Sequence, residues 1–105
     1  MIMRITWGKV RPGMWGKLET VYKDFAKDSK DTKGQLGRWL LSDPAQTDAA
    51  CFLTLWESLD DFKNYDPPRS FYDEMIDCFV GPNPFVVTSC DVRGMEISAL
   101  KQKLG

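Results

Sequence analysis

The stretch Cys51–Phe62, Cys-Phe-Leu-Thr-Leu-Trp-Glu-Ser-Leu-Asp-Asp-Phe, decides the fold of this chain. Its first half is a nearly continuous apolar run, and the sequence turns polar abruptly at Glu57. A run this short, containing Thr, Phe and Trp, is typical of a strand buried on both faces. Ser58 has the pattern of a helix N-cap, and Asp61 supplies a carboxylate three residues later. The stretch therefore predicts a central strand that leads directly into a helix.

Length and composition indicate one ordinary globular domain. The chain has 105 residues, 43% of them hydrophobic and 28% charged. Lys and Arg total 14 and Asp and Glu total 15, so the net charge is −1 and no basic surplus favours nucleic acid or an anionic membrane. No signal peptide or membrane-spanning segment is indicated. We expect a cytoplasmic protein without a nucleic-acid or membrane partner.

The histidine and cysteine content limits the kinds of catalytic and metal site that the chain could form. The chain has no histidine, which is the commonest general base and metal ligand. The cysteines Cys51, Cys78 and Cys90 are odd in number and widely spaced, and fit neither a disulfide framework nor a zinc site. We expect them to be small buried hydrophobic residues. The sequence predicts no metal and no cofactor, and it singles out no catalytic residue.

The order of hydrophobic patterns predicts an α+β domain. The expected elements are a strand over 2–10, a helix from 14 to about 27, strands over 36–41 and from 51 joined by a turn over 42–49, a helix from 58 to near 66, a helix from 68 to 79, a strand over 85–92 and a C-terminal helix over 95–104. This is the ferredoxin-like βαββαβ plan, an antiparallel four-stranded sheet with helices on one face, followed by an extra C-terminal helix. Residues 1–93 would form the domain and residues 94–105 a helical tail.

The sheet face without helices is predicted to be apolar. The residues assigned to it are Met3, Ile5, Trp7, Trp39 and Phe52. An exposed apolar face of this extent usually marks a protein interface. We therefore expect a homodimer that packs through this open sheet face.

Two arginines within strands are candidates for ligand binding. Each of Arg4 and Arg38 would extend to water, pair with a carboxylate, or bind an anionic group of a ligand, and the sequence leaves these alternatives open. Arg38 is assigned to the helix side only because Trp39 suits the dimer side better. The tryptophans Trp7, Trp39 and Trp56 would either stack on an aromatic ligand or, as we favour, fill the core and the interface.

Strand alternation and helical stripes together place a ligand site between the helices and the sheet. The residues expected to line it are Arg4, Thr6, Arg38, Phe62, Tyr65, Tyr72 and Met75. A small aromatic molecule is the ligand that these side chains suit.

Several short motifs resemble one protein family. They are Arg11-Pro12-Gly13 after the first strand, the Asp43-Pro44 turn, Leu55-Trp56-Glu57-Ser58 before Asp61-Phe62, and Phe71 on the short helix after Pro68. Over residues 1–93 the chain resembles the antibiotic biosynthesis monooxygenase-like (ABM) domains of the dimeric α+β barrel superfamily. The resemblance implies a dimeric α+β barrel with a cavity in each subunit.

The resemblance also implies a choice of functions. The family includes cofactor-free oxygenases of electron-rich aromatic quinols or polyketides, so it implies a homodimeric, cofactor-independent monooxygenase of aromatic or quinol-like molecules. The alternative is a non-catalytic dimeric module that binds small molecules or other proteins. The haem-degrading branch uses an Asn, a Trp and a His where this chain has Thr6, Tyr65 and Met75. We therefore expect no haem degradation.

Overall fold

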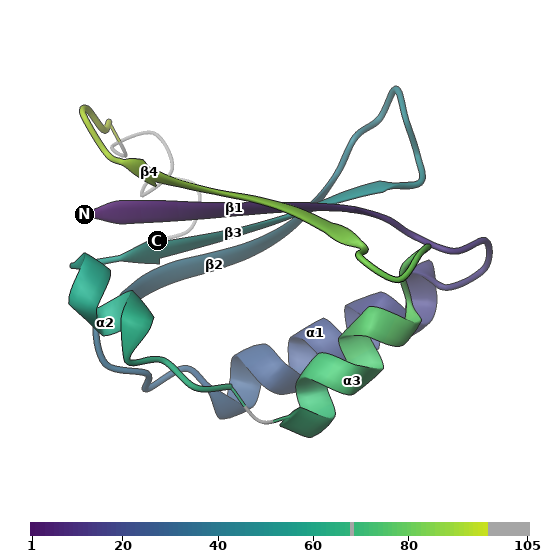
Figure 1. Cartoon of the computed structure of the whole chain (residues 1–105), viewed down its shortest axis with the longest axis horizontal. Helices are drawn as coiled ribbons and strands as arrows, with labels where there is room; N and C mark the ends of the chain where they lie inside the picture. The colour runs from purple at the N-terminus through teal and green to yellow at the C-terminus, as the bar shows by residue number, and fades with distance from the viewer. Residues whose placement is uncertain (68, 97–105) are drawn as a thin grey trace.

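The computed structural model describes residues 1–67 and 69–96. Its elements are β1 (Ile2–Lys9), α1 (Trp15–Asp28), β2 (Gln35–Ser42), β3 (Ala49–Trp56), α2 (Leu59–Lys63), α3 (Arg69–Asp77) and β4 (Phe85–Asp91). The four strands form one antiparallel sheet in the order β2-β3-β1-β4. All three helices lie on the same side of this sheet (Figure 1). The predicted α+β, ferredoxin-like fold is confirmed.

The junction between β3 and α2 follows the pattern of the Cys51–Phe62 stretch. The backbone N–H of Asp61 donates to the Ser58 hydroxyl over 3.1 Å, and that hydroxyl donates to the Asp61 carboxylate over 3.0 Å. Ser58 is thus the N-cap of α2, as expected. The helix is only five residues long, and α3 is a separate helix that begins at Arg69.

The core lies between the sheet and the pair α1 and α3. Leu18 of α1, Cys78 and Phe79 are fully buried in it. The rings of Phe25 and Phe71 stack with their centroids 3.6 Å apart, which joins α1 to α3. This packing holds the two long helices against one end of the sheet.

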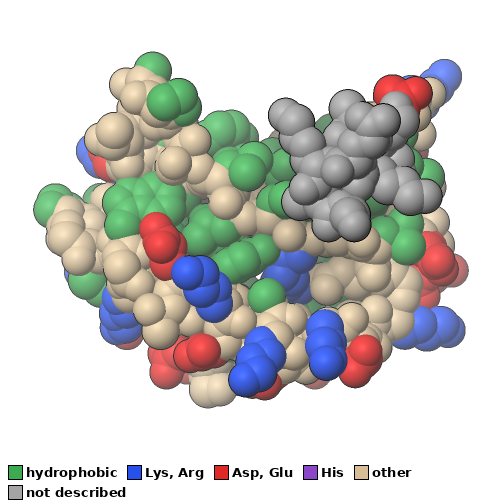
Figure 2. All heavy atoms as spheres, turned by 180° about the vertical axis from the view of Figure 1, so that it is seen from behind, with side chains coloured by type: hydrophobic (Ala, Val, Ile, Leu, Met, Phe, Trp, Pro, Cys, Tyr) green, Lys and Arg blue, Asp and Glu red, His purple; other side chains and the backbone are tan. Residues whose placement is uncertain are grey.

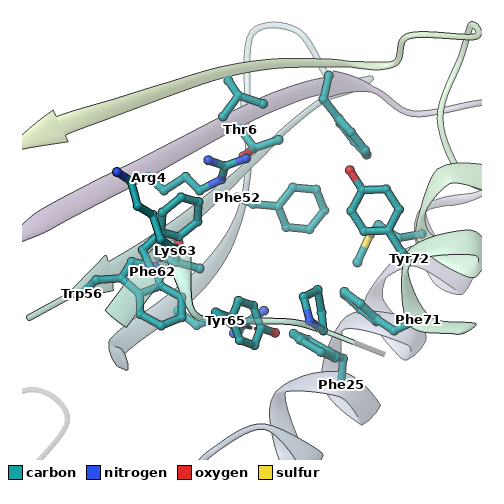
Figure 3. Close-up of a pocket in the computed structure, with 16 residues that line it drawn as sticks. Arg4, Thr6, Phe25, Phe52, Trp56, Phe62, Lys63, Tyr65, Phe71 and Tyr72 are labelled. Carbon is teal, nitrogen blue, oxygen red and sulfur yellow. Dashed lines mark hydrogen bonds between the residues drawn. The ribbon is translucent and has the colours of Figure 1, made fainter. Parts of the chain in front are cut away.

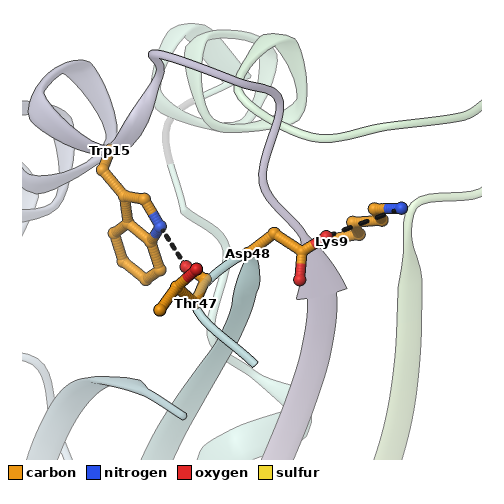
Figure 4. A network of polar contacts seen from close by, with 4 residues as sticks. All are labelled: Lys9, Trp15, Thr47 and Asp48. Atoms are coloured by element: carbon orange, nitrogen blue, oxygen red, sulfur yellow. Dashed lines mark hydrogen bonds and ion pairs between the residues drawn. The ribbon is translucent and has the colours of Figure 1, made fainter. Parts of the chain in front are cut away.

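The loop between β2 and β3 is fixed to the start of α1. The indole N–H of Trp15 donates to the Thr47 carbonyl over 2.8 Å, and Lys9 lies 3.5 Å from the Asp48 carboxylate (Figure 4). The ion pair is largely exposed, so it contributes little to stability. The buried Val10 adds a backbone bond of 2.7 Å to the Asp48 carbonyl.

Phe52 does not lie on the open face of the sheet, so that assignment was wrong. In the β1–β3 register Phe52 is opposite Thr6, and its ring centroid lies 5.9 Å from that of Phe79 on the helix side. The register reveals the error, because residues directly opposite each other in paired strands lie on the same face of the sheet. Phe52 and Thr6 therefore share the helix side. Trp7 lies on the open face as expected, in a row across all four strands made of Leu41, Cys51, Trp7 and Val86.

The remaining expectations concern the cysteines, the C-terminal helix, Pro68 and membrane-spanning segments. Cys51 and Cys78 are buried as expected, whereas Cys90 is exposed. The expected C-terminal helix and the role of Pro68 in opening a helix lie outside the described residues, except that Met95 and Glu96 are not helical. Within residues 1–67 and 69–96, no helix has the length and apolar character needed to cross a membrane.

Candidate functional site

A cavity of about 360 Å³ lies between the sheet and the helices. This volume is within the range of small-molecule sites in proteins. Aromatic rings from opposite layers, including those of Phe52, Phe62 and Tyr72, face the same space (Figure 3). From the other side of the molecule, hydrophobic side chains border a hollow between the two layers, with a basic side chain inside it (Figure 2).

The seven residues expected to form a ligand site all line this cavity. They are Arg4 and Thr6 from β1, Arg38 from β2, Phe62 from α2, Tyr65 from the segment after α2, and Tyr72 and Met75 from α3. Among these seven residues, the strands supply both arginines, and the aromatic rings come from α2, α3 and the segment after α2. Arg38 is on the helix side, as the sequence argument assumed.

Sequence reasoning missed more than half of the wall. The further lining residues are Phe25, Phe52, Thr54, Trp56, Lys63, Pro67, Phe71, Phe85 and Val87. The hydrophobic stripes of the helices contained Phe25 and Phe71, but nothing in those stripes separates cavity wall from core. The face of Trp56 was left undecided. It points to the helix side, is 1% exposed, and donates its indole N–H to the Thr54 hydroxyl over 3.0 Å.

Both strand arginines lie against aromatic rings. The guanidinium carbon of Arg4 is 4.5 Å from the Phe62 ring centroid, and that of Arg38 is 4.3 Å from the Phe25 ring centroid. Both arginines are register partners of Thr54, so they flank it in one row of the sheet. Three alternatives were open for these arginines: contact with water, pairing with a carboxylate, or binding of an anionic ligand group. Neither Arg4 nor Arg38 makes an ion pair within the described residues, so pairing with a carboxylate of those residues is excluded.

The charged side chains among the described lining residues are all basic. The described lining residues include Arg4, Arg38 and Lys63, and none of them is Asp or Glu. Burial lowers the pKa of Arg4, which an adjacent Tyr72 partly opposes, but an arginine stays protonated at neutral pH. The cavity therefore presents positive charge in an otherwise apolar space, and it favours an anionic ligand group.

Arg38 has unused hydrogen-bonding capacity. Its Nη2 donates to the Tyr65 hydroxyl over 3.4 Å, a long bond. Its Nε is buried and has no hydrogen-bond partner in the described part of the chain. A buried donor of this kind is uncommon in native proteins and is often found where something else binds.

The environment of Tyr65 in the site favours its neutral, protonated form. Burial raises the pKa of Tyr65, although the positive charge of Arg38 and its hydrogen bond act in the opposite direction. Tyr22, which lies beside the cavity residue Phe52, behaves in the same way. Among residues 1–67 and 69–96 there is also no cluster of three metal-ligating side chains. The described lining residues include no Asp or Glu, and the chain has no His, that could accept a proton at neutral pH.

Comparison with known proteins supports the fold. No protein-family model matches the chain, and no curated protein is similar to it. Among solved structures, a candidate antibiotic biosynthesis monooxygenase from Caulobacter crescentus superposes with a TM-score of 0.77 at 23% identity, over 89% of this chain and 90% of that one. A second, from Nitrosomonas europaea, gives a TM-score of 0.76 at 11% identity, over 90% and 100%.

A third structure has a stated activity in its name. SnoaB, a cofactor-independent oxygenase from Streptomyces nogalater, superposes with a TM-score of 0.74 at 11% identity, over 90% of this chain and 94% of SnoaB. The fold is that of the antibiotic biosynthesis monooxygenases. The resemblance to ABM domains is thus confirmed at the level of fold. Identities this low leave the activity of this chain to be argued from its own residues.

Proposed function

We propose that this protein is a cofactor-independent monooxygenase of electron-rich aromatic or quinol-like molecules. The observation that carries the proposal is the aromatic cavity in which Arg4 and Arg38 face the ligand space without a carboxylate partner in the described residues. The ABM fold adds support, because SnoaB has this fold and is named as a cofactor-independent oxygenase.

The chemistry needs no redox group from the protein. A phenol with a free para carbon and one O₂ give a quinone and one water. One oxygen atom becomes the new carbonyl oxygen, the other leaves as water, and the substrate supplies all four electrons. Ionisation of the phenol starts the reaction, because the phenolate is the electron-rich form that O₂ oxidises.

The residues of this chain would act on that ionisation. Arg4 and Arg38 stabilise a phenolate in a space with little water, where electrostatic effects are stronger than in bulk solvent. The aromatic walls hold the ring of the substrate and limit side reactions of its intermediates with water. The phenolic proton leaves to solvent, since the described cavity wall holds no carboxylate and the chain holds no histidine.

The test is oxygen uptake with naphthalene-1,5-diol, which this reaction converts to 5-hydroxy-1,4-naphthoquinone. We expect uptake above a protein-free blank, one coloured quinone per O₂, and no hydrogen peroxide. The double variant Arg4→Met/Arg38→Met should lose at least 90% of the rate. Lys9→Ala, which alters only an exposed ion pair, is the matched control. Uptake equal to the blank, or full activity in the double variant, contradicts the proposal.

One observation favours the second candidate, a non-catalytic binding module. The described cavity wall contains no Asp or Glu and the chain no His, so the site offers binding groups but no general base, which a module that only binds does not need. A module of this type binds naphthalene-1,5-diol without oxygen uptake. Calorimetry under nitrogen therefore separates the two functions, since both predict binding and only the first predicts turnover.

We further propose that the protein is a homodimer through the open sheet face. Trp7, Leu41 and Val86 lie in one row of that face and are 45%, 42% and 70% exposed. Trp7 and Val86 are direct neighbours, and Leu41 lies on the other side of the buried Cys51. Exposed apolar side chains gathered on one face favour association. Sedimentation should give twice the chain mass for the wild type and the chain mass for Leu41→Glu/Val86→Glu. Leu59→Glu, exposed on α2, should stay dimeric. A monomeric wild type at micromolar concentration contradicts this.

A further inference from the structure

We propose that the ligand of this cavity carries a carboxylate, which binds edge-on to the Nε and Nη2 nitrogens of Arg38 beside the Tyr65 hydroxyl. The inference rests on the proposed function for the location of the site and adds the chemical class of the ligand. The ligand is thus an aromatic hydroxy acid, with a phenolic ring among the aromatic walls and an acid group at Arg38.

The first step is the state of the Arg38 nitrogens. Nε has no partner in the described residues, and Nη2 makes only the 3.4 Å bond to the Tyr65 hydroxyl. In arginine these two nitrogens lie on the same edge of the guanidinium group. One complete edge of Arg38, with two parallel N–H donors, is therefore free or weakly used.

The second step is that this edge is held in place. The ring of Phe25, 4.3 Å from the guanidinium carbon, covers one face of the group and fixes its plane. Phe25 is itself only 5% exposed and stacks on Phe71, so it cannot move aside without disturbing the core. The unused donors, the buried Nε and the weakly bonded Nη2, lie on the edge of the group and not on the face that Phe25 covers, so the inferred contact with a ligand is at this edge.

The third step is the match between this edge and a carboxylate. Two parallel N–H groups pair with the two oxygens of a carboxylate, whereas a phenolate offers a single oxygen. The Tyr65 hydroxyl, protonated because burial raises its pKa, lies beside the same edge and can donate to a carboxylate oxygen. Arg4, on the other side of Thr54, leaves a separate cation for the phenolic oxygen.

The absence of a competing group completes the argument. None of the described lining residues is Asp or Glu, so no protein carboxylate occupies this edge. Arg38 lies in the middle of β2 and its register partner is Thr54 on β3, so its backbone position is set by the ladder of the sheet. The guanidinium group is placed before the ligand arrives, which reduces the entropy lost on binding.

The experiment compares three ligands that share one ring system: 6-hydroxy-2-naphthoate, 2-naphthol and 2-naphthoate. Calorimetry at pH 7.5 under nitrogen measures binding without turnover. We expect the wild type to bind 6-hydroxy-2-naphthoate at least about tenfold more tightly than 2-naphthol, the effect of one charge-assisted hydrogen bond. The 2-naphthoate should keep most of that preference, since it retains the carboxylate and lacks only the phenol.

Variants assign the effect to Arg38. In Arg38→Met the preference for the carboxylate should fall to within about threefold of unity, and in Arg38→Lys, which keeps the charge without the two-donor edge, it should be intermediate. Arg4→Met should weaken 2-naphthol and 6-hydroxy-2-naphthoate alike and keep the preference. Thermal unfolding checks that each variant is folded, and the wild-type comparison stands even if Arg38→Met is not.

Several results overturn the inference. They are equal wild-type affinities for 6-hydroxy-2-naphthoate and 2-naphthol, a preference that survives in Arg38→Met, and no binding of any of the three. A rise of 2-naphthol affinity to the level of the acid as its phenol ionises at higher pH, measured in Arg4→Met so that Arg4 cannot cause it, would show that Arg38 recognises any anion, and it also counts against a carboxylate. Because no turnover is measured, failure of oxygen uptake leaves this inference standing, and equal affinities leave the oxygenase proposal standing.

Discussion

The guanidinium carbon of Arg38 lies 4.3 Å from the centroid of the Phe25 ring, so helix α1 fixes a cation that strand β2 supplies. The contact lies where the helix meets the floor of the cavity, and both side chains line it. A cation over an aromatic face away from water stabilises a protein by up to about 2 kcal/mol. The pair is therefore part of the fold as well as part of the site.

This contact predicts a measurable coupling. A double-mutant cycle of Arg38→Met and Phe25→Leu, followed by urea unfolding, should give a coupling free energy of about 1–2 kcal/mol. The same cycle with Arg4→Met in place of Arg38→Met should give a value near zero, since Arg4 contacts Phe62 instead. Equal coupling in the two cycles would show that the effect is general loosening and not the cation–ring contact.

Two glycines offer a matched test of packing between β2 and α2. Gly13 and Gly34 have φ values of +76° and +77°, but a Cβ on Gly13 meets open space, whereas a Cβ on Gly34 would overlap the Asp61 side chain. Gly13→Ala should cost about 1–2 kcal/mol of unfolding free energy for the left-handed backbone alone. Gly34→Ala should cost at least about 1 kcal/mol more, because of the overlap. Similar losses for both would mean that Asp61 moves aside freely.

The raised pKa of Tyr65 predicts a loss of stability in alkali. Its neutral form is favoured in the folded state, so the contribution is complete below pH 10.0, the ordinary tyrosine value, and is lost as the pH rises through the higher pKa of the folded protein. The difference in unfolding free energy between wild type and Tyr65→Phe should be constant from pH 7 to 9. Above pH 10 it should shift in favour of Tyr65→Phe. A constant difference up to pH 11 would contradict the effect of burial.

Haem provides a test of what the site does not accept. The chain lacks histidine, and Thr6, Tyr65 and Met75 occupy the cavity wall, where the haem-degrading relatives are expected to have Asn, Trp and His. Titration with haem under a reductant should give no saturable Soret shift and no verdohaem- or biliverdin-like product. A specific spectrum followed by ring opening would overturn this prediction.

The fold followed from the sequence because most of its elements are marked locally. The apolar run before Glu57, the Ser58 cap and the break at Pro67 each act over a few residues, and these short-range signals place the elements. The faces of the strands were harder. The error at Phe52 arose because a strand buried on both sides has no alternation of polar and apolar residues, so only pairing with Thr6 reveals its direction.

The residues of the candidate site were also predicted only in part from the sequence. Arg4 and Arg38 stood out because a cation within a strand needs an explanation, strand alternation added Thr6, and all three line the cavity. The assignment of Arg38 was exposed to error, because the register of β2 against β3 shifts between Gln35 and Gly37, and the alternation holds only beyond that irregularity. Phe25 and Phe71 were not identified, since a ring that faces a cavity and a ring that fills a core have the same sequence pattern.

The cavity takes its two arginines from strands and most of its rings from helices and loops. Backbone pairing between strands sets the positions of Arg4 and Arg38 on one row of the sheet, while Phe62, Phe71 and Tyr72 lie on the helices α2 and α3, outside the sheet. The orientation of a bound molecule and the size of its ring system are therefore separable traits. Substitutions on α2 and α3 should change which ring system binds. They should not change which end of the ligand lies against Arg4 and Arg38. Under the proposed function, substitutions in the helices can change the accepted aromatic ring while the two strand arginines that bind its anionic group stay in place.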